Sequence, residues 1–133
     1  MPTFSRNERL KSRKLISRLF REGHSYMAYP LRVVWLPVGP EEVQATGFGD
    51  APAQLAISVP KRSFKTAVQR NRLKRRIREA YRLNKHGWYE KLAADGLHLA
   101  LMLVYVGKEE LTYEEIAGGV KKMIKKFPAQ SAG

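Results

Sequence analysis

The chain has 133 residues, 44% of them hydrophobic, and it carries 25 lysines and arginines against 12 acidic residues, a net charge of +13. This length and apolar fraction favour a single domain with a buried core and exclude a disordered polycation. The charge indicates a polyanionic partner, and nucleic acid is favoured over a membrane surface because no long amphipathic helix carries an aromatic anchoring face. The absence of cysteine excludes disulfides, thiolate metal sites and a cysteine nucleophile.

No stretch has the length and apolar character of a signal peptide or a membrane span, and the longest apolar run, 99–106, is too short to cross a bilayer. We therefore expect a cytoplasmic protein with no membrane partner, and nothing in the sequence points to an obligate protein partner. Residues 1–133 are expected to form one domain, with an ordered core over about 5–127 and a tail over 128–133.

The first predicted element is a helix that begins at Ser5 and runs to about Glu22. Ser5 and Glu8 have the spacing of a capping box, and Gly23 is placed to end the helix. Four apolar residues share one face of this helix: Leu15, Ile16, Leu19 and Phe20.

Two strands are predicted next, over 31–38 and 54–59, with a loop over 39–53 between them. The second strand alternates apolar and small residues, and the loop is rich in glycine and proline.

A second capping box at Thr66 predicts a long helix that ends at about Asn84 or Lys85, and a short helical piece is expected over 88–94. The stretch 97–106 is apolar on both faces, which indicates a central strand.

The last predicted helix opens with a capping box at Thr112 and is stopped by Pro128. The pair Gly118-Gly119 weakens it. Four lysines fall where a helix C-terminus favours cations: Lys121, Lys122, Lys125 and Lys126. The whole order is helix, strand, strand, helix, strand, helix, in one α+β domain with a small central sheet and three main helices.

The helix after Thr66 carries the strongest functional signal. Its apolar residues, Leu73, Ile77, Ala80 and Tyr81, share the face that must pack on the sheet. The remaining surface is cationic, and only Glu79 offsets it; its candidate RNA-binding residues are Arg70, Asn71, Arg72, Lys74, Arg75, Arg76, Arg78 and Arg82. Arginines suit bidentate phosphate contacts. The alternatives are a solvated charged face and, for Arg70 at the edge of the apolar face, an internal pair with a carboxylate or backbone carbonyls.

The run from Arg70-Asn71-Arg72 through Leu73-Lys74-Arg75 to Ile77-Arg78-Glu79-Ala80-Tyr81-Arg82 resembles the signature helix of the bacterial ribonuclease P protein family. The first helix, the strand over 97–106 and the start of the last helix are also similar, so the resemblance covers about residues 7–127.

The resemblance implies an α/β sandwich with a left-handed crossover around the basic helix, although most crossovers are right-handed. It also implies an RNA-binding subunit of an endoribonuclease that removes the 5′ leader of precursor tRNA. The catalytic RNA would perform the hydrolysis with magnesium, the protein's basic helix would bind that RNA, and no catalytic or metal-binding residue is assigned to this chain.

The same resemblance implies a cleft between the first helix and the sheet that holds the single-stranded leader. Its candidate residues here are Ile16, Phe20, Val34, Trp35, Lys61 and Arg62. The strand register decides between Val34 and Trp35, and core packing is the alternative role for Ile16 and Phe20.

Two other functional classes compete with this interpretation. A ribosomal or other structural RNA-binding protein would be equally small and basic, but its charge would concentrate in a tail or loop. A protein nuclease would need clustered carboxylates, whereas the only aspartates are Asp50 and Asp95 in loop-like contexts, and the three histidines (His24, His86 and His98) share no catalytic motif.

Overall fold

The computed structural model describes the backbone of residues 3–132 and the side chains of residues 3–127. Within this part of the chain, four strands form a mixed sheet in the order β1-β2-β4-β3: β1 His24–Ala28, β2 Leu31–Pro37, β4 Leu99–Tyr105 and β3 Ala53–Ser58. β2 is antiparallel to β1 and β4, whereas β3 is parallel to β4. This α+β architecture and the central position of β4 confirm the sequence-based expectation.

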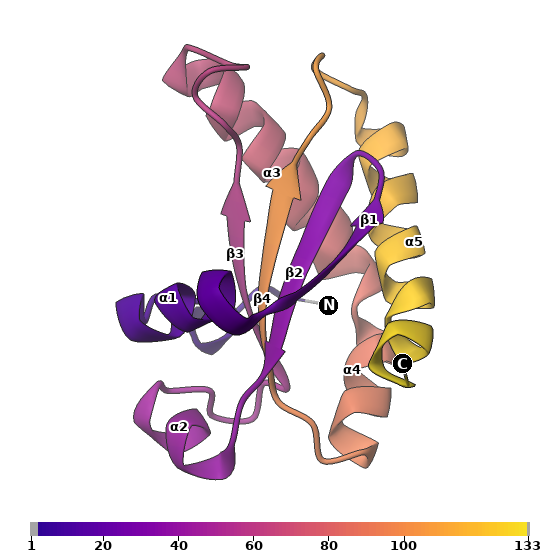
Figure 1. Cartoon of the computed structure of the whole chain (residues 1–133). Coiled ribbons are helices and arrows are strands. Elements are labelled where there is room, and N and C mark those ends of the chain that lie inside the picture. Colours follow the sequence, from indigo (N-terminus) through magenta and orange to yellow (C-terminus); the bar gives the residue numbers. More distant parts are fainter. Residues whose placement is uncertain (1–2, 133) are drawn as a thin grey trace.

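Helices cover both faces of the sheet (Figure 1). The helices α3 Ala67–Asn84, α4 His86–Ala94 and α5 Tyr113–Ala132 lie on one face, and α1 Arg13–Glu22 lies against the other. The larger core fills the first interface and includes Val33, Leu73, Ile77, Tyr81, Leu101, Leu103, Ile116 and Val120. The smaller core lies under α1 and includes Leu10, Leu15, Leu19, Leu36, Phe48, Ala100 and Met102. β4 contributes to both cores, which explains why it is apolar on both faces.

The connection from β3 to β4 has the unusual hand that the family resemblance implied. In Figure 1 both strands point upward, β4 lies to the right of β3, and α3 passes behind the sheet. A connection that moves to the right behind the sheet is left-handed, whereas the great majority of such crossovers are right-handed.

The first helix differs from the prediction, because the chain is not helical from Ser5 onward. A single 3-10 turn, η1 Arg6–Glu8, uses the predicted capping box and is followed by extended chain. The Leu10 N–H then donates to the Leu55 carbonyl at 3.0 Å, so this segment pairs with the free edge of β3 and protects it. α1 begins only after Ser12, which accepts the Leu15 N–H at 3.2 Å.

Two elements were not predicted. β1 carries only one buried side chain, Ala28, so its sequence lacks the alternation of a half-buried strand. The expected loop over 39–53 contains a short helix, α2 Pro40–Ala45, which starts with proline at its first turn and two acidic residues beside it.

α5 continues through Pro128 to Ala132, so the predicted stop at Pro128 and the predicted tail are wrong as far as Ala132, while Gly133 lies outside the described residues. Inside a helix, proline removes its own N–H from the hydrogen-bond ladder and its ring crowds the carbonyl four residues earlier, which bends a helix without necessarily ending it. Gly119 has a packing role in this helix. A Cβ there would lie 2.7 Å from Pro30 Cδ and 2.9 Å from the Tyr29 carbonyl, so glycine lets α5 approach the β1–β2 turn.

Among the described helices, none combines the length and the apolar character that crossing a membrane would require.

Candidate nucleic-acid interface

The basic face of α3 is oriented as its sequence predicts. Thr66 caps the helix by accepting the Gln69 N–H at 3.2 Å. The four predicted apolar residues are completely buried against the sheet and α5. On the outside, Asn71, Arg72, Arg75 and Arg78 are exposed, and Lys74, Arg76 and Arg82 are half-buried.

Several of these cations bind groups of the protein itself. Arg72 forms a bidentate pair with Glu110, with Nε–Oε1 and Nη2–Oε2 distances of 2.7 and 3.2 Å, and this contact raises the pKa of Arg72 and lowers that of Glu110. Arg82 pairs with Glu79 at 2.7 Å, and Arg76 donates to the Leu111 carbonyl at 2.7 Å. Glu110 therefore offsets the basic face in addition to Glu79, which the sequence pattern of one helix did not reveal.

Two arginines stand apart from these pairs. Arg75 and Arg78 make no hydrogen bond or ion pair with any residue in the described part of the chain. Arg70 behaves differently: its Nη1 donates to the Phe64 carbonyl at 2.8 Å, so the internal contact with a backbone carbonyl, one of its two predicted roles, is present.

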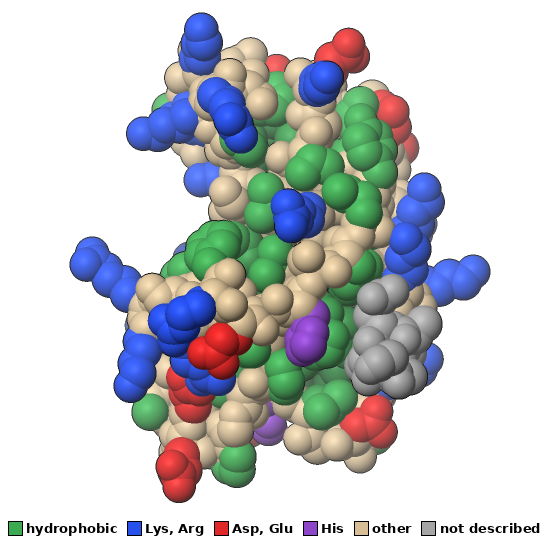
Figure 2. Space-filling view, in the orientation of Figure 1, with side chains coloured by type: hydrophobic (Ala, Val, Ile, Leu, Met, Phe, Trp, Pro, Cys, Tyr) green, Lys and Arg blue, Asp and Glu red, His purple; other side chains and the backbone are tan. Residues whose placement is uncertain are grey.

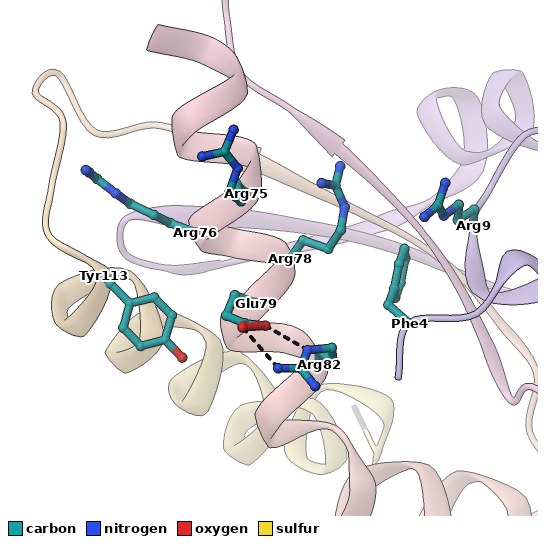
Figure 3. A pocket seen from close by; sticks show the side chains of 8 residues that line it. All are labelled: Phe4, Arg9, Arg75, Arg76, Arg78, Glu79, Arg82 and Tyr113. Carbon is teal, nitrogen blue, oxygen red and sulfur yellow. Dashed lines mark hydrogen bonds and ion pairs between the residues drawn. The ribbon is translucent and has the colours of Figure 1, made fainter. Parts of the chain in front are cut away.

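Arg75 and Arg78 line a pocket of about 470 Å³ on the outer side of α3 (Figure 3). The N-terminal segment supplies one wall, and α5 contributes Tyr113. The lining residues are Phe4, Arg9, Arg75, Arg76, Arg78, Glu79, Arg82 and Tyr113. Figure 3 shows Arg78 on the side of α3 that faces Phe4 and Arg9. The pocket therefore combines aromatic rings with several guanidinium groups, a composition suited to a nucleotide chain.

Sequence reasoning missed Phe4 and Arg9, which reach α3 because a buried ion pair holds the N-terminal segment. Glu8 and Lys85 are only 5% and 6% exposed and form a salt bridge. Glu8 also accepts hydrogen bonds from the Tyr89 hydroxyl at 2.9 Å and the Ser5 N–H at 2.7 Å. Burial alone would raise the pKa of Glu8, but the hydrogen bonds from Lys85, Ser5 and Tyr89 outweigh it and lower that pKa. The capping box was visible in the sequence, whereas its link to Lys85 was not.

A second candidate surface lies on the opposite face of the sheet, beside α1. Phe20 is 65% exposed, so the packing role is excluded for this ring, whereas Ile16 and Val34 are half-buried against the small core. A Cβ at Gly23 would lie 3.1 Å from Val34 Cγ1, which places Val34 beneath the end of α1. The α1 side of the sheet thus presents an exposed aromatic ring next to partly exposed aliphatic side chains.

Trp35 does not belong to this surface, so Val34 is the one of these two neighbouring strand residues that faces α1. Its ring is 7% exposed and packs edge-to-face on Phe127 at 4.9 Å, on the α5 side of the sheet. Neighbouring residues of a strand point to opposite faces, so Val34 faces α1 and Trp35 cannot. His24 covers Trp35 at a ring separation of 4.6 Å.

Lys61 and Arg62 lie in the turn that follows β3, and both are exposed. Figure 2 shows a hollow between α1 and the lobe formed by this turn and the start of α3, with hydrophobic side chains on its floor and basic side chains above and below it. Of the six residues predicted for the cleft, the structure gathers Ile16, Phe20 and Val34 on the α1 side of the sheet, with Lys61 and Arg62 at the end of the strand that borders it.

Two of the three histidines contact side chains outside both surfaces. His86 is 3.8 Å from Glu90, and His98 packs edge-to-face on Phe48. In the residues that the structure describes, no three histidine or acidic side chains gather as metal ligands would.

Comparison with known proteins places the chain in a family. The model of the family described as Ribonuclease P matches residues 4–128. A protein of Porphyromonas gingivalis strain W83, called ribonuclease P protein component, is 35% identical over 125 residues, which cover 92% of this chain and 86% of that protein. The chain belongs to the ribonuclease P protein family.

Solved structures of ribonuclease P proteins share the fold. The Thermotoga maritima protein superimposes with a TM-score of 0.67 at 22% identity, over 90% of this chain and 97% of that one. A Staphylococcus aureus RNase P protein gives 0.65 at 23% identity, over 89% and 93%. Because the ribonuclease P family acts in tRNA processing and takes part in an endoribonuclease, both surfaces described above are candidate contacts for RNA.

Proposed function

We propose that this chain is the protein subunit of ribonuclease P and that it uses two surfaces for two RNAs. The α3 face would bind the catalytic RNA, and the hollow beside α1 would hold the 5′ leader of precursor tRNA. The observation that carries the proposal is the placement of a cationic helix and an exposed aromatic ring on opposite faces of one sheet. This arrangement lets one small protein contact two RNA segments at once.

The α3 face suits a structured RNA because two of its exposed arginines are not engaged by acidic groups of the described part of the chain. Arg75 and Arg78 are exposed and form no ion pair with described residues, so they can approach phosphates without losing an internal partner. Guanidinium groups bind phosphate oxygens bidentately. Arg72 would have to exchange Glu110 for a phosphate, so we rank it behind the other two.

The α1 side suits a single strand because it combines a stacking platform with nearby charge. The exposed Phe20 ring can stack on a base, and the aliphatic surface of Ile16 and Val34 borders it. Lys61 and Arg62 carry the positive charge that follows the backbone of a single strand.

We assign the hydrolysis to the RNA partner, with a magnesium-activated water as the nucleophile. This chain would contribute binding energy and position the substrate, and we assign it no catalytic residue and no metal. Its buried carboxylate, Glu8, is engaged by Lys85, Ser5 and Tyr89 in holding the N-terminal segment.

The test is purification of the tagged chain from its host at moderate salt, followed by sequencing of the bound RNA and a cleavage assay on precursor tRNA. We expect the chain and ribonuclease P RNA together to release the 5′ leader in magnesium, and the protein alone to release none. Recovery of ribosomal RNA instead would support the structural RNA-binding alternative. Cleavage by RNA-free protein that is lost on mutation of a carboxylate or histidine would refute the proposal.

A further inference from the structure

The middle of α5 carries a concentration of positive charge that the proposed function does not use. Four lysines lie within six residues, Lys121, Lys122, Lys125 and Lys126, and all are exposed. The sequence from Ile116 to Ala132 contains no acidic residue. Lysines four positions apart on a helix repel one another, as Lys121 and Lys125 do here, so the free helix is destabilised by its own charges.

The helix dipole does not account for these lysines. It favours cations only within the last turn of a helix, and α5 runs to Ala132 with no basic residue in its last turn. Lys126 has a partner in the fold, because its Nζ donates to the Met27 carbonyl at 2.8 Å. Lys121, Lys122 and Lys125 make no hydrogen bond or ion pair with the residues described.

The placement of Lys126 shows which way the other lysines face. Each residue turns an α-helix by about 100°, so Lys121 and Lys125 share one flank of the buried stripe and Lys126 lies on the opposite flank. Lys122 lies between the two flanks, on the side of the helix that points away from the stripe. The flank of Lys126 faces β1, because Lys126 contacts Met27 there. The flank of Lys121 and Lys125 is therefore the one beside α3, which packs along α5 (Figure 1).

We infer that Lys121, Lys122 and Lys125, the α5 lysine face, bind the phosphate backbone of the catalytic RNA next to the segment held by α3. This inference rests on the proposed function. Lysines act as point charges that suit a phosphate backbone without base recognition. The face has no apolar or aromatic anchor of the kind that interfacial helices use, which argues against a lipid surface. It continues the outer side of the helical layer on which Arg75 and Arg78 lie.

The test is a salt titration of binding between the chain and a ribonuclease P RNA transcript, without tRNA. Lys121→Gln/Lys125→Gln removes the two positive charges on the flank beside α3, and glutamine has a helix propensity similar to that of lysine. Each lost phosphate contact lowers the slope of log K against log salt by roughly 0.7–0.9, so we expect the slope to fall by about 1.5. The control Lys14→Gln/Lys108→Gln removes two exposed lysines elsewhere, on α1 and before α5, and should change the slope by less than half as much.

The outcomes separate this inference from the proposed function. If the salt slope falls equally in Lys121→Gln/Lys125→Gln and in the control, the effect comes from net charge alone and the inference is overturned. Binding of Lys121→Gln/Lys125→Gln with the wild-type affinity and slope would also overturn it. If the lysine variant binds as the wild type does but Arg75→Gln/Arg78→Gln binds more weakly in the same titration, the inference fails and the proposed function is retained. If no variant changes binding, the proposed use of α3 fails too.

A second measurement locates the contact. Because the chain has no cysteine, Lys122→Cys can carry a single tethered iron–EDTA group that cleaves nearby RNA. We expect cuts in the catalytic RNA close to those produced from Arg75→Cys. Cuts from position 75 together with none from position 122 would overturn the inference.

Discussion

Replacing Phe20 with alanine separates a stacking role for this ring from a packing role. The ring is 65% exposed, so its removal should change the free energy of unfolding by no more than about 0.5 kcal/mol. Loss of one stacked base costs about 1–3 kcal/mol. Phe20→Ala is therefore expected to raise the Kd for precursor tRNA by about 5- to 150-fold at 25 °C and to leave the Kd for mature tRNA unchanged.

The measurement is equilibrium binding of precursor and mature tRNA to the complex of the chain with its catalytic RNA. The adjacent Leu19 provides the matched control, because it is completely buried. Leu19→Ala should lower the free energy of unfolding by about 2–5 kcal/mol, without a selective loss for the leader in the folded fraction. An equal loss for both tRNAs, or none for either, would refute the assignment of Phe20 to the leader.

Three further predictions concern α3 and the buried ion pair. Arg75→Gln/Arg78→Gln should lower the salt slope of catalytic-RNA binding by about one unit or less per residue and leave the melting temperature unchanged, as titrations and melting curves will show. Ile77→Ala truncates a fully buried side chain and should cost about 2–5 kcal/mol of stability in urea unfolding. Glu8→Gln leaves the Lys85 ammonium buried without its charged partner and should cost about 3–5 kcal/mol at pH 7. Because the folded-state pKa of Glu8 is lowered from 4.5, the stability that its charge provides is present above the unfolded value and disappears as pH falls through the folded value. The gap between wild type and Glu8→Gln should therefore close in urea unfolding below about pH 4.5, and a gap that does not change with pH would contradict this role.

The basic helix could be predicted in detail because its signals are local. The capping box at Thr66 and the apolar spacing of Leu73, Ile77 and Tyr81 lie within the helix itself, and they gave both its start and its buried face. The exposure of Arg75 and Arg78 follows from the same periodicity. What periodicity could not supply was the partner of Arg72, since Glu110 comes from a separate segment 38 residues away.

The N-terminal segment could not be predicted because its structure depends on distant residues. Glu8 and Lys85 are separated by 77 positions, and the pairing of Leu10 with the edge of β3 requires the sheet to exist first. A continuous helix from Ser5 satisfies the local sequence rules. The folded chain instead gains buried apolar area and a protected strand edge, and it brings Phe4 and Arg9 to α3.

The strand register beside α1, which decides between Val34 and Trp35, posed a different difficulty. β2 is covered on both faces, so Val34 and Trp35 are both apolar and the alternation of a half-buried strand is lost. Period two assigns them to opposite sides but does not say which side α1 occupies. Only the packing of the Gly23 turn on Val34 and of Phe127 on Trp35 decides it.

The two proposed RNA surfaces meet in the segment between β3 and α3. Lys61 and Arg62 lie at its start and Arg70 follows its end, inside α3. The segment is held at its middle, because the buried Phe64 ring packs on Tyr105 of β4 and its carbonyl accepts the hydrogen bond from Arg70. A guanidinium that fixes this turn would therefore influence both proposed surfaces at once. Arg70 is therefore better explained as the residue that holds the two surfaces in register than as one more phosphate contact.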